Sequence, residues 1–265
     1  MEPEQRVAVI GSGISGISAA WMLRDRHAVT LFERNDYFGG HTHTIVVDEN
    51  GSGVPVDTGF IVYNEPNYPH LTGLFDVLGI VTRDTEMSFA ASVGQPRLEY
   101  AGSDLDTLFA QRRNLLNPGF LGMVWDILRF NRLCKERLRT AGFGDMTLGG
   151  LIEREHLGQR FRDRYLLPMA AAIWSCPPQT MLEFPAASFA RFFENHGLLD
   201  LKDRPQWKTV RGGSHTYINR MLEDIGAGVR CGHPVTAVTR RQGQVEIVLA
   251  SGERLGFDQV VLACH

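Results

Sequence analysis

The sequence predicts an α/β fold in which a Rossmann-like domain carries an inserted, mainly helical domain. A short apolar run, a glycine-rich turn and an amphipathic segment follow one another in the first 33 residues, as in a βαβ unit. Strand patterns give way to helical patterns between residues 104 and 199 and return near the C-terminal end. We therefore expect the Rossmann-like domain in 1–85 and 206–265, and the helical domain in 86–205.

The expected βαβ unit begins with Val7–Ile10, a nearly continuous apolar run of the kind that forms a buried parallel strand. Ile14–Arg24 has apolar residues at helical spacing, and Ala28–Phe32 forms a second apolar run that ends at Glu33. Glycine, asparagine and acidic residues over 48–53 predict the turn of a hairpin. The hairpin strands are 45–47 and 54–56, the other expected helices are 68–78, 115–139, 148–157 and 186–195, and the other expected strands are 235–238, 245–249 and 259–263.

The composition excludes several classes of protein. With 43% hydrophobic and 22% charged residues, the chain is globular rather than disordered, and its formal net charge of -3 does not favour nucleic acid as a partner. The cysteines form no C-x-x-C pair, so we expect reduced, mostly packed thiols. The short polar N-terminus, 1–6, does not resemble a signal peptide, and the longest apolar stretch, 166–174, is too short to cross a bilayer. These observations predict a cytoplasmic protein.

The turn after the first strand has the pattern G-x-G-x-x-G, which binds dinucleotides when it lies between a strand and a helix. In this pattern the first glycine permits the tight turn, the second admits a pyrophosphate, and the third lets the helix pack on the sheet. Glu33, at the end of the second strand, is placed to accept hydrogen bonds from ribose hydroxyls and to repel a 2′-phosphate. The expected dinucleotide-binding residues of the turn are Gly11, Ser12, Gly13, Ile14, Ser15 and Gly16.

The turn alone fits FAD and NAD equally, but the residues after it narrow the choice. The segment from Glu33 to Gly40 resembles the acid-to-Gly-Gly segment of the flavin-containing amine oxidase and phytoene desaturase superfamily. The resemblance implies FAD as the cofactor, with the backbone of Gly39 and Gly40 near its pyrophosphate and Arg34 among the cofactor-binding residues. His41, followed by Thr42, stands where the family usually has a basic residue.

The resemblance extends over both ends of the chain. Residues 211–214 resemble the glycine pair before the family's return helix, and 258–264 resemble its next sheet strand. Residues 41–44 and 57–64 resemble a bacterial branch of predicted flavoproteins. Since family members usually continue beyond this point, we expect a C-terminally truncated chain. The further cofactor-binding residues that the resemblance implies are Asp57, Thr58, Gly59 and Phe60 beside the flavin and Val235 beside the adenine.

Other side chains admit two interpretations each. His41 and His43 could share one face of a strand, but no spacing supplies a third metal ligand, so we expect no metal site and leave open a flavin-pocket or a plain polar role. Tyr63, Asn64 and Tyr68 could line a substrate cavity or begin a helix. For the aromatic residues Trp174, Phe184, Phe189, Phe192 and Phe193 we favour a core role over a pocket role.

The segment 115–139 combines an apolar stretch with a basic end. Such a helix could lie on an anionic membrane surface, but we favour a core helix with a solvated end.

Together these patterns predict an FAD-dependent oxidoreductase that transfers a hydride from a small, apolar, lipid-like substrate to flavin N5. No catalytic side chain can be named from the sequence. The alternatives are an NAD-dependent dehydrogenase, a non-catalytic FAD-binding fragment and an isomerase that uses FAD without net oxidation. A hydrolase is not supported, because the sequence has no G-x-S-x-G motif.

Overall fold

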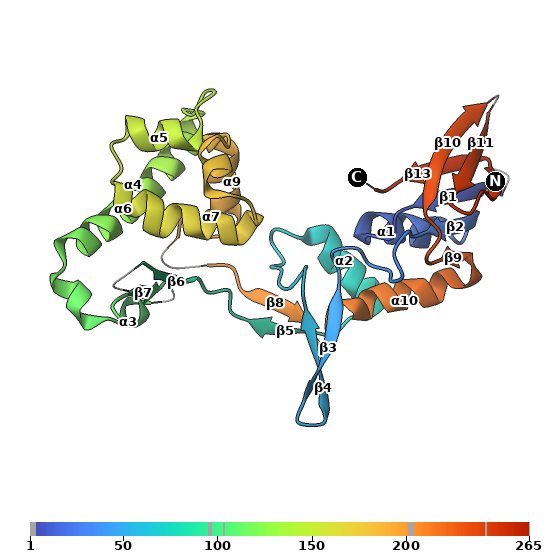
Figure 1. Ribbon diagram of the computed structural model, residues 1–265, viewed down its shortest axis with the longest axis horizontal. Helices are drawn as coiled ribbons and strands as arrows, with labels where there is room; N and C mark the ends of the chain where they lie inside the picture. Colours follow the sequence, from blue (N-terminus) through green and yellow to red (C-terminus); the bar gives the residue numbers. More distant parts are fainter. Residues whose placement is uncertain (1–3, 95–96, 103, 201–203, 242, 265) are drawn as a thin grey trace. The chain divides into compact units, whose positions relative to one another are not determined.

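The computed structural model describes residues 4–94, 97–102, 104–200, 204–241 and 243–264. The chain divides into two compact units, each with its own core (Figure 1). Unit 1 consists of Met1–Thr85 and Trp207–His265, and unit 2 consists of Glu86–Gln206. The start of the polar N-terminus, 1–3, and Gln242 in the turn between two expected strands lie outside the described residues.

Unit 1 is built on a parallel sheet with the strand order β13-β1-β2-β9. The expected βαβ unit forms as β1 (Arg6–Ile10), α1 (Ile14–Leu23) and β2 (Ala28–Phe32). Both β2 and β13 (Gln259–Leu262) pair with β1, so the chain leaves β1 on one side and returns on the other. Such a reversal of strand order opens a crevice at the carboxyl ends of the strands. The short β9 (Val229–Arg230) completes the sheet beside β2.

The two faces of this sheet are covered by different layers (Figure 1). Val7, Val9 and Leu31 pack with the helices, and α1 contacts α10. Ala8 and Phe32 point to the other face, where they pack against an antiparallel sheet of three strands. The alternation follows from the period-two geometry of a strand. The covering elements are α2 (Pro69–Leu78) and α10 (His215–Ile225) on the first face, and β10 (Val235–Arg241), β11 (Gln244–Leu249) and β12 (Arg254–Phe257) on the second.

Two further strand pairs belong to unit 1. The expected hairpin forms as β3 (Thr44–Glu49) and β4 (Ser52–Asp57), joined by Asn50 and Gly51 with positive φ. In addition, β5 (Thr82–Thr85) pairs with β8 (Trp207–Val210) at the two points where the chain crosses between the units. The sequence pattern did not predict this pair, because its strands are short and β5 is entirely polar.

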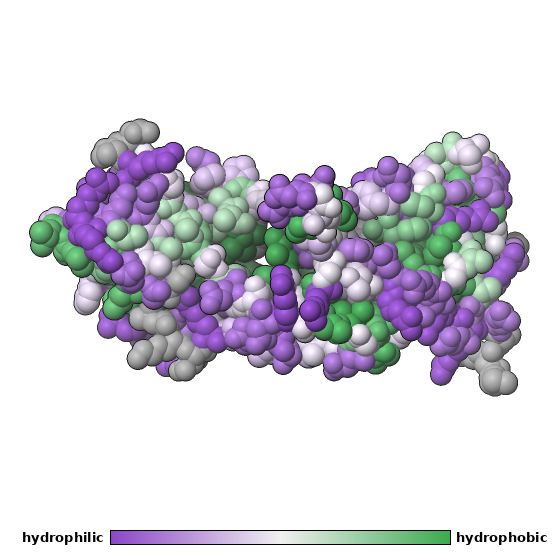
Figure 2. Space-filling model, turned by 90° about the horizontal axis from the view of Figure 1, so that it is seen from below, coloured by the Kyte–Doolittle hydropathy of each residue, from purple (hydrophilic) through white to green (hydrophobic). Residues whose placement is uncertain are grey.

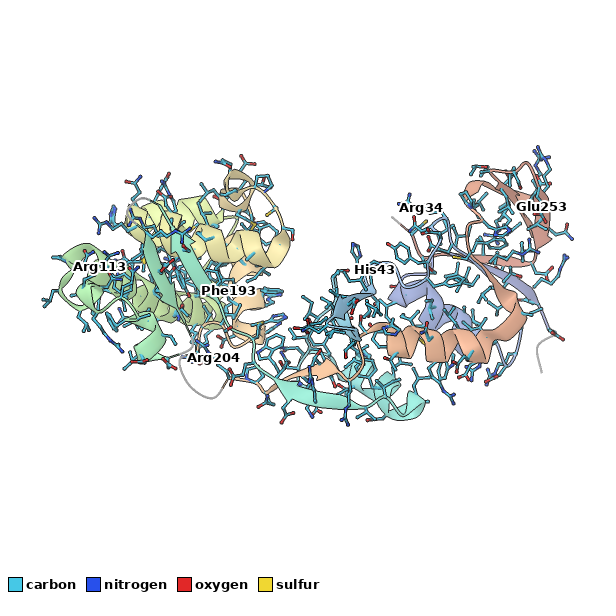
Figure 3. All side chains as sticks on the ribbon, turned by 60° about the horizontal axis from the view of Figure 1, so that its bottom comes forward. Arg34, His43, Arg113, Phe193, Arg204 and Glu253 are labelled. Atoms are coloured by element: carbon cyan, nitrogen blue, oxygen red, sulfur yellow. The ribbon has the colours of Figure 1, made fainter. Side chains whose placement is uncertain are left out.

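Unit 2 is mainly helical around an aromatic core, and Phe193 lies inside it (Figure 3). The aromatic residues for which a core role was favoured belong to this cluster, and Phe189 and Phe193 are almost fully buried. Burial also raises the pKa of the Cys134 thiol to about 12, as expected for a packed cysteine. The elements are β6 (Ala90–Val93), β7 (Leu98–Ala101), α3 (Leu105–Leu108), η1 (Arg112–Leu116), α4 (Pro118–Thr140), α5 (Leu148–Arg154), α6 (Gln159–Phe161), η2 (Arg162–Leu166), α7 (Leu167–Trp174), α8 (Pro178–Leu182) and α9 (Ala186–Asn195).

Two expected helices differ from the structure by three residues at one end. The helix expected over 115–139 begins at Pro118, after Asn117 caps it by accepting hydrogen bonds from the N–H groups of Gly119 and Phe120. The helix expected over 148–157 ends at Arg154, and His156 adopts a positive φ of 50°. The β6–β7 hairpin was not anticipated. Across the described residues, no helix has the length and apolarity needed to cross a membrane.

Candidate functional site

A cavity of about 940 Å³ lies in unit 1, at the crevice where the strand order reverses. Its wall includes many of the residues that the sequence singles out, and Arg34 reaches it from the loop that follows β2 (Figure 3). The expected cofactor residues on this wall are Gly11, Ser12, Gly13, Ile14, Ser15, Glu33, Arg34, Gly39, Gly40, His41, Thr42 and Val235.

Each of the three glycines in the glycine-rich turn has a different structural role. Gly11 has a φ of 102°, and a Cβ atom there would lie 2.6 Å from the carbonyl oxygen of Ala263. Gly16 lies beneath the turn rather than on the cavity wall, and a Cβ atom there would lie 1.8 Å from the carbonyl oxygen of Gly11. A Cβ atom on Gly13 would meet nothing within 4 Å, because this residue faces open space. The turn is therefore closed beneath and open toward the cavity.

The N-terminus of α1 opens onto the same cavity. Its N-cap is Gly13, which offers no side chain to the first N–H groups of the helix, and the first turn holds no acidic residue. The first N–H groups of a helix have no partner within the helix, and with the helix dipole they favour a negative charge. This end of α1 suits an anion such as a pyrophosphate.

Glu33 is a buried carboxylate held in place by the turn. One carboxylate oxygen accepts hydrogen bonds from the Ser12 N–H at 3.0 Å and from the Ser12 hydroxyl at 2.5 Å, and the other accepts from the Asn35 N–H at 2.8 Å. Burial alone would raise the pKa of Glu33, but these hydrogen bonds, led by that from Asn35, hold it below its ordinary value. Glu33 is therefore ionised at neutral pH and is a fixed acceptor on the cavity wall.

The second glycine turn, at Gly39 and Gly40, packs directly on the first. The Gly39 N–H donates to the carbonyl oxygen of Ser12 at 2.9 Å, and a Cβ atom on Gly40 would lie 3.1 Å from the Cα of Gly13. Thr42 is buried behind this turn, where its hydroxyl lies 3.0 Å from that of Tyr217. Burial raises the pKa of Tyr217 to about 12, so its hydroxyl keeps its proton. The two turns form one rigid wall.

The residues expected beside the flavin do not lie on this wall. The Thr58 N–H donates to the carbonyl oxygen of His43, and the Phe60 N–H donates to that of His41, which ties this segment to the wall residue His41. Gly59 passes close to His41, since a Cβ atom there would lie 2.0 Å from its carbonyl oxygen. Asp57 accepts hydrogen bonds from the Ser214 N–H at 2.8 Å and the Ser214 hydroxyl at 2.7 Å, and so anchors the turn before α10. A role beside the flavin stays a prediction for all four.

Several wall residues were not singled out from the sequence. Leu262, Ala263 and Cys264 reach the cavity because β13 is the neighbour of β1, and Asn35, Tyr37 and His233 join them. Residues at the carboxyl ends of parallel strands form the ligand crevice, so a correct sheet order would have identified the β13 residues. The N–H of His233 donates to the carbonyl oxygen of Glu33 at 2.7 Å, which brings the segment before β10 to the cavity.

The structure places the histidines and tyrosines noted in the sequence in different surroundings. His41 lines the cavity, whereas Nδ1 of His43 lies 3.0 Å from the Thr58 hydroxyl and its ring lies 4.5 Å from that of Tyr37. In the described part of the chain, no three His, Cys, Asp or Glu side chains gather in a way that could hold a metal ion. Tyr63 and Asn64 are buried, and Tyr63 packs against Tyr68 and Phe75 in the core of unit 1.

A strand, a glycine-rich turn, a helix N-terminus and a buried acid thus surround one cavity. A family model described as flavin containing amine oxidoreductase matches residues 14–265. The chain belongs to this family. Its cofactor is FAD, as the sequence resemblance implied.

Curated and structural relatives agree with this family. A flavin-dependent L-tryptophan oxidase, RebO, of Lentzea aerocolonigenes is 24% identical, and the match covers 94% of this chain and 55% of that protein. A 1-hydroxycarotenoid 3,4-desaturase of Flavobacterium sp. (strain P99-3) is 34% identical over 32% of this chain and 16% of that protein. The solved cyclohexylamine oxidase of Brevibacterium oxydans IH-35A has a TM-score of 0.72 at 22% identity, over 98% of this chain and 58% of that one, which shows a shared fold. The chain therefore spans little more than half the length of the oxidases it matches.

The residues present fit a dinucleotide of this kind. The cavity is large enough for an extended ligand and offers an open glycine at a helix N-terminus for phosphate groups. A fixed carboxylate follows at the end of β2 for hydroxyl groups, and the Arg34 side chain supplies a positive charge on the wall. The wall holds both apolar and polar groups, as sites for large cofactors usually do.

Proposed function

We propose that the protein is an FAD-dependent oxidoreductase and that this cavity holds the ADP half of the cofactor. The single observation that carries the proposal is the common wall of the two glycine turns, the α1 N-terminus and Glu33. In this arrangement the backbone around Gly13 and Gly40 binds the pyrophosphate, and Glu33 accepts hydrogen bonds from the ribose. Val235 lies beside the adenine, where it contributes packing.

The flavin half extends toward the segment that includes Asp57, Thr58, Gly59 and Phe60. Support for this placement comes from the hydrogen bonds that join the segment to His41 and His43. Bound FAD supplies a two-electron acceptor, so that a hydride from a substrate C–H bond can be taken up at flavin N5. The residues of this chain bind and orient the cofactor and keep water from its buried edge.

We further propose an apolar substrate. The helical unit supports this proposal, because its core is aromatic. Two curated relatives are named for an aromatic amino acid and a carotenoid derivative, both with large apolar portions.

Anaerobic titration of the flavin-loaded protein tests this function. Apolar amines, aromatic amino acids and isoprenoid compounds are added in turn, and the flavin absorbance is followed. Stoichiometric bleaching by an apolar compound, reversed by air, is the expected result. Bleaching by small hydrophilic amines alone would contradict the substrate proposal, and bound FAD that no compound reduces would favour a non-catalytic FAD-binding role.

The NAD-dependent dehydrogenase considered from the sequence has no support among the comparisons, which match flavin enzymes. An isomerase would convert its substrate without bleaching, which the same titration detects when the products are analysed.

A further inference from the structure

Helix α4 has two apolar faces, of which only one packs in the core of unit 2. Phe120, Met123 and Phe130 are buried on the inner face, as expected for a core helix. Large apolar side chains remain exposed elsewhere on α4 and in the turn before it, and hydrophobic surface is visible at the left edge of Figure 2, where Figure 1 places that turn. The exposed fractions are 49% for Leu115, 88% for Leu116, 43% for Leu121, 63% for Trp125 and 40% for Leu128.

The exposed side chains of α4 form a single straight stripe. Each residue of an α-helix turns by roughly 100° from the last, so positions three, four and seven apart lie on one side. Leu121, Trp125 and Leu128 follow this spacing, and Arg132 and Arg139 continue it toward the C-terminal end. We call this set the α4 stripe. Its first half is apolar, and its second half carries Arg132 and Arg139 with the exposed Glu136 between them.

The charged half of the α4 stripe borders a groove of about 520 Å³. Arg132 and Arg139 line it, and in the described part of the chain neither side chain has a hydrogen bond or an ion pair. Lys135 also lines it but is paired with Asp200, and Glu136 is the acidic residue on the wall. Two cations therefore remain free to meet an outside anion.

A buried amide lies beside this groove. Asn131 lines it, is 8% exposed, and its side-chain oxygen has no hydrogen-bond partner among the described residues. An unpartnered buried polar atom costs free energy, so a ligand group that reached this amide would be stabilised by a hydrogen bond. A phosphate group carrying a hydroxylated headgroup could accept from and donate to this amide.

We propose that the α4 stripe docks on the surface of an anionic phospholipid bilayer. The aliphatic and indole side chains of the first half enter the boundary between headgroups and acyl chains, where tryptophan is favoured. Arg132 and Arg139 meet lipid phosphates, and the groove beside Asn131 receives one headgroup. The charge of the stripe is complementary to an anionic surface, and this interaction is independent of the proposed oxidoreductase activity.

A second copy of the chain fits the α4 stripe less well. In a two-fold symmetric pair with antiparallel α4 helices, Arg139 of one copy would face Leu121 of the other, and each cation would lose water against an apolar surface. In a parallel pair, the two basic halves would face each other and repel. A flat anionic surface satisfies both halves of the stripe at once.

Sedimentation of the intact, flavin-loaded protein with vesicles tests the proposal. One set of vesicles contains phosphatidylcholine alone, and the other contains phosphatidylcholine and phosphatidylglycerol in equal parts. We expect binding to the second set that weakens with added salt, with a shift of tryptophan emission to shorter wavelength. Arg132→Ser and Arg139→Ser should each weaken binding about fivefold, and Trp125→Ser should abolish the emission shift.

Matched variants control for loss of charge or apolar surface in general. Met22→Ser, at a residue 73% exposed in unit 1, and the double change Arg240→Ser with Arg241→Ser should leave vesicle binding unchanged. Retained flavin content and an unchanged unfolding midpoint show that each variant is folded. Equal binding to both sets of vesicles, or equal losses in test and control variants, would overturn the proposal. So would a concentration-dependent dimer that Trp125→Ser disrupts in a protein that binds no vesicles.

Discussion

Ser12 is the residue that joins the two glycine turns to the buried acid. Its hydroxyl donates to Glu33 at 2.5 Å and lies 3.3 Å from the Gly39 nitrogen, and the side chain is fully buried. A hydrogen bond to a charged group is worth about 1.5–3 kcal/mol. The hydroxyl therefore acts as a positioning group, because it fixes the carboxylate that we place against the ribose.

Replacing Ser12 by alanine should weaken FAD binding about tenfold or more, by the free energy of a hydrogen bond to a charged group. Ser18→Ala is the matched control, since Ser18 lies in α1 away from the cavity wall. Fluorescence titration of the flavin-free protein with FAD measures both dissociation constants. Equal effects of the two changes would show that Ser12 does not position Glu33.

The lowered pKa of Glu33 links its ionisation to folding. Hydrogen bonds to the carboxylate favour its charged form in the folded protein, so the folded-state pKa lies below the unfolded value of 4.5. The stability that these bonds add is fully present above pH 4.5 and is lost as the pH falls through the lower folded-state pKa.

Urea unfolding across this range should therefore show a pH-dependent difference between the native protein and Glu33→Gln. The difference in unfolding free energy should be largest at neutral pH and should shrink on acidification, because the protonated acid resembles the amide. A difference that stays constant from neutral pH to pH 3, roughly one unit below the ordinary pKa of a glutamate, would contradict the linkage.

At the scale of elements, the turn before α1 contains one glycine that is required for packing and another that faces the proposed cofactor site. Gly16 contacts the backbone of Gly11 beneath the turn, whereas Gly13 has an ordinary φ of -63° and faces the cavity. One methyl group added at each position should therefore act on different properties of the protein.

Gly13→Ala should keep the unfolding midpoint and weaken FAD binding at least tenfold, because the methyl group occupies the space that we assign to the pyrophosphate. Gly16→Ala should destabilise the fold by about 1–3 kcal/mol, as overpacking does. Thermal unfolding of the flavin-free variants and titration with FAD give the two quantities. If Gly13→Ala binds FAD as tightly as the native protein, the pyrophosphate does not lie at this turn.

The elements that the sequence predicted well are those with a strong period. The run Ala28–Phe32 and the helix Ala186–Asn195 appear with their expected bounds, because burial imposes a clear pattern on both. The strand Thr82–Thr85 was missed, since its polar residues form a strand only through pairing with Trp207–Val210. Tertiary pairing of this kind leaves no local pattern.

In the candidate site, too, only some of the residues could be predicted from the sequence. Its glycine turn and Glu33 are close in sequence and follow a known spacing, so they could be located from the sequence. His233 and Cys264 reach the cavity only through the loop before β10 and the position of β13 beside β1. Spacing along the chain does not contain that information.

At the scale of the whole molecule, one chain combines a cofactor cavity in unit 1 with an aromatic, mainly helical unit 2. The two halves of unit 1 are far apart in sequence, and both contribute to the cavity wall, through residues 11–15 and 262–264. The FAD site that we propose therefore requires the chain on both sides of unit 2, and we expect FAD binding to report on the assembly of unit 1 as a whole.

The most direct test of the central claim is the visible absorption spectrum of the purified protein, followed by identification of the nucleotide that it releases on denaturation. We predict a flavin spectrum and released FAD, with the bound amount reduced in Gly13→Ala. A colourless protein that also takes up no added FAD, or one that releases NAD instead, would contradict the assignment of this cavity to FAD.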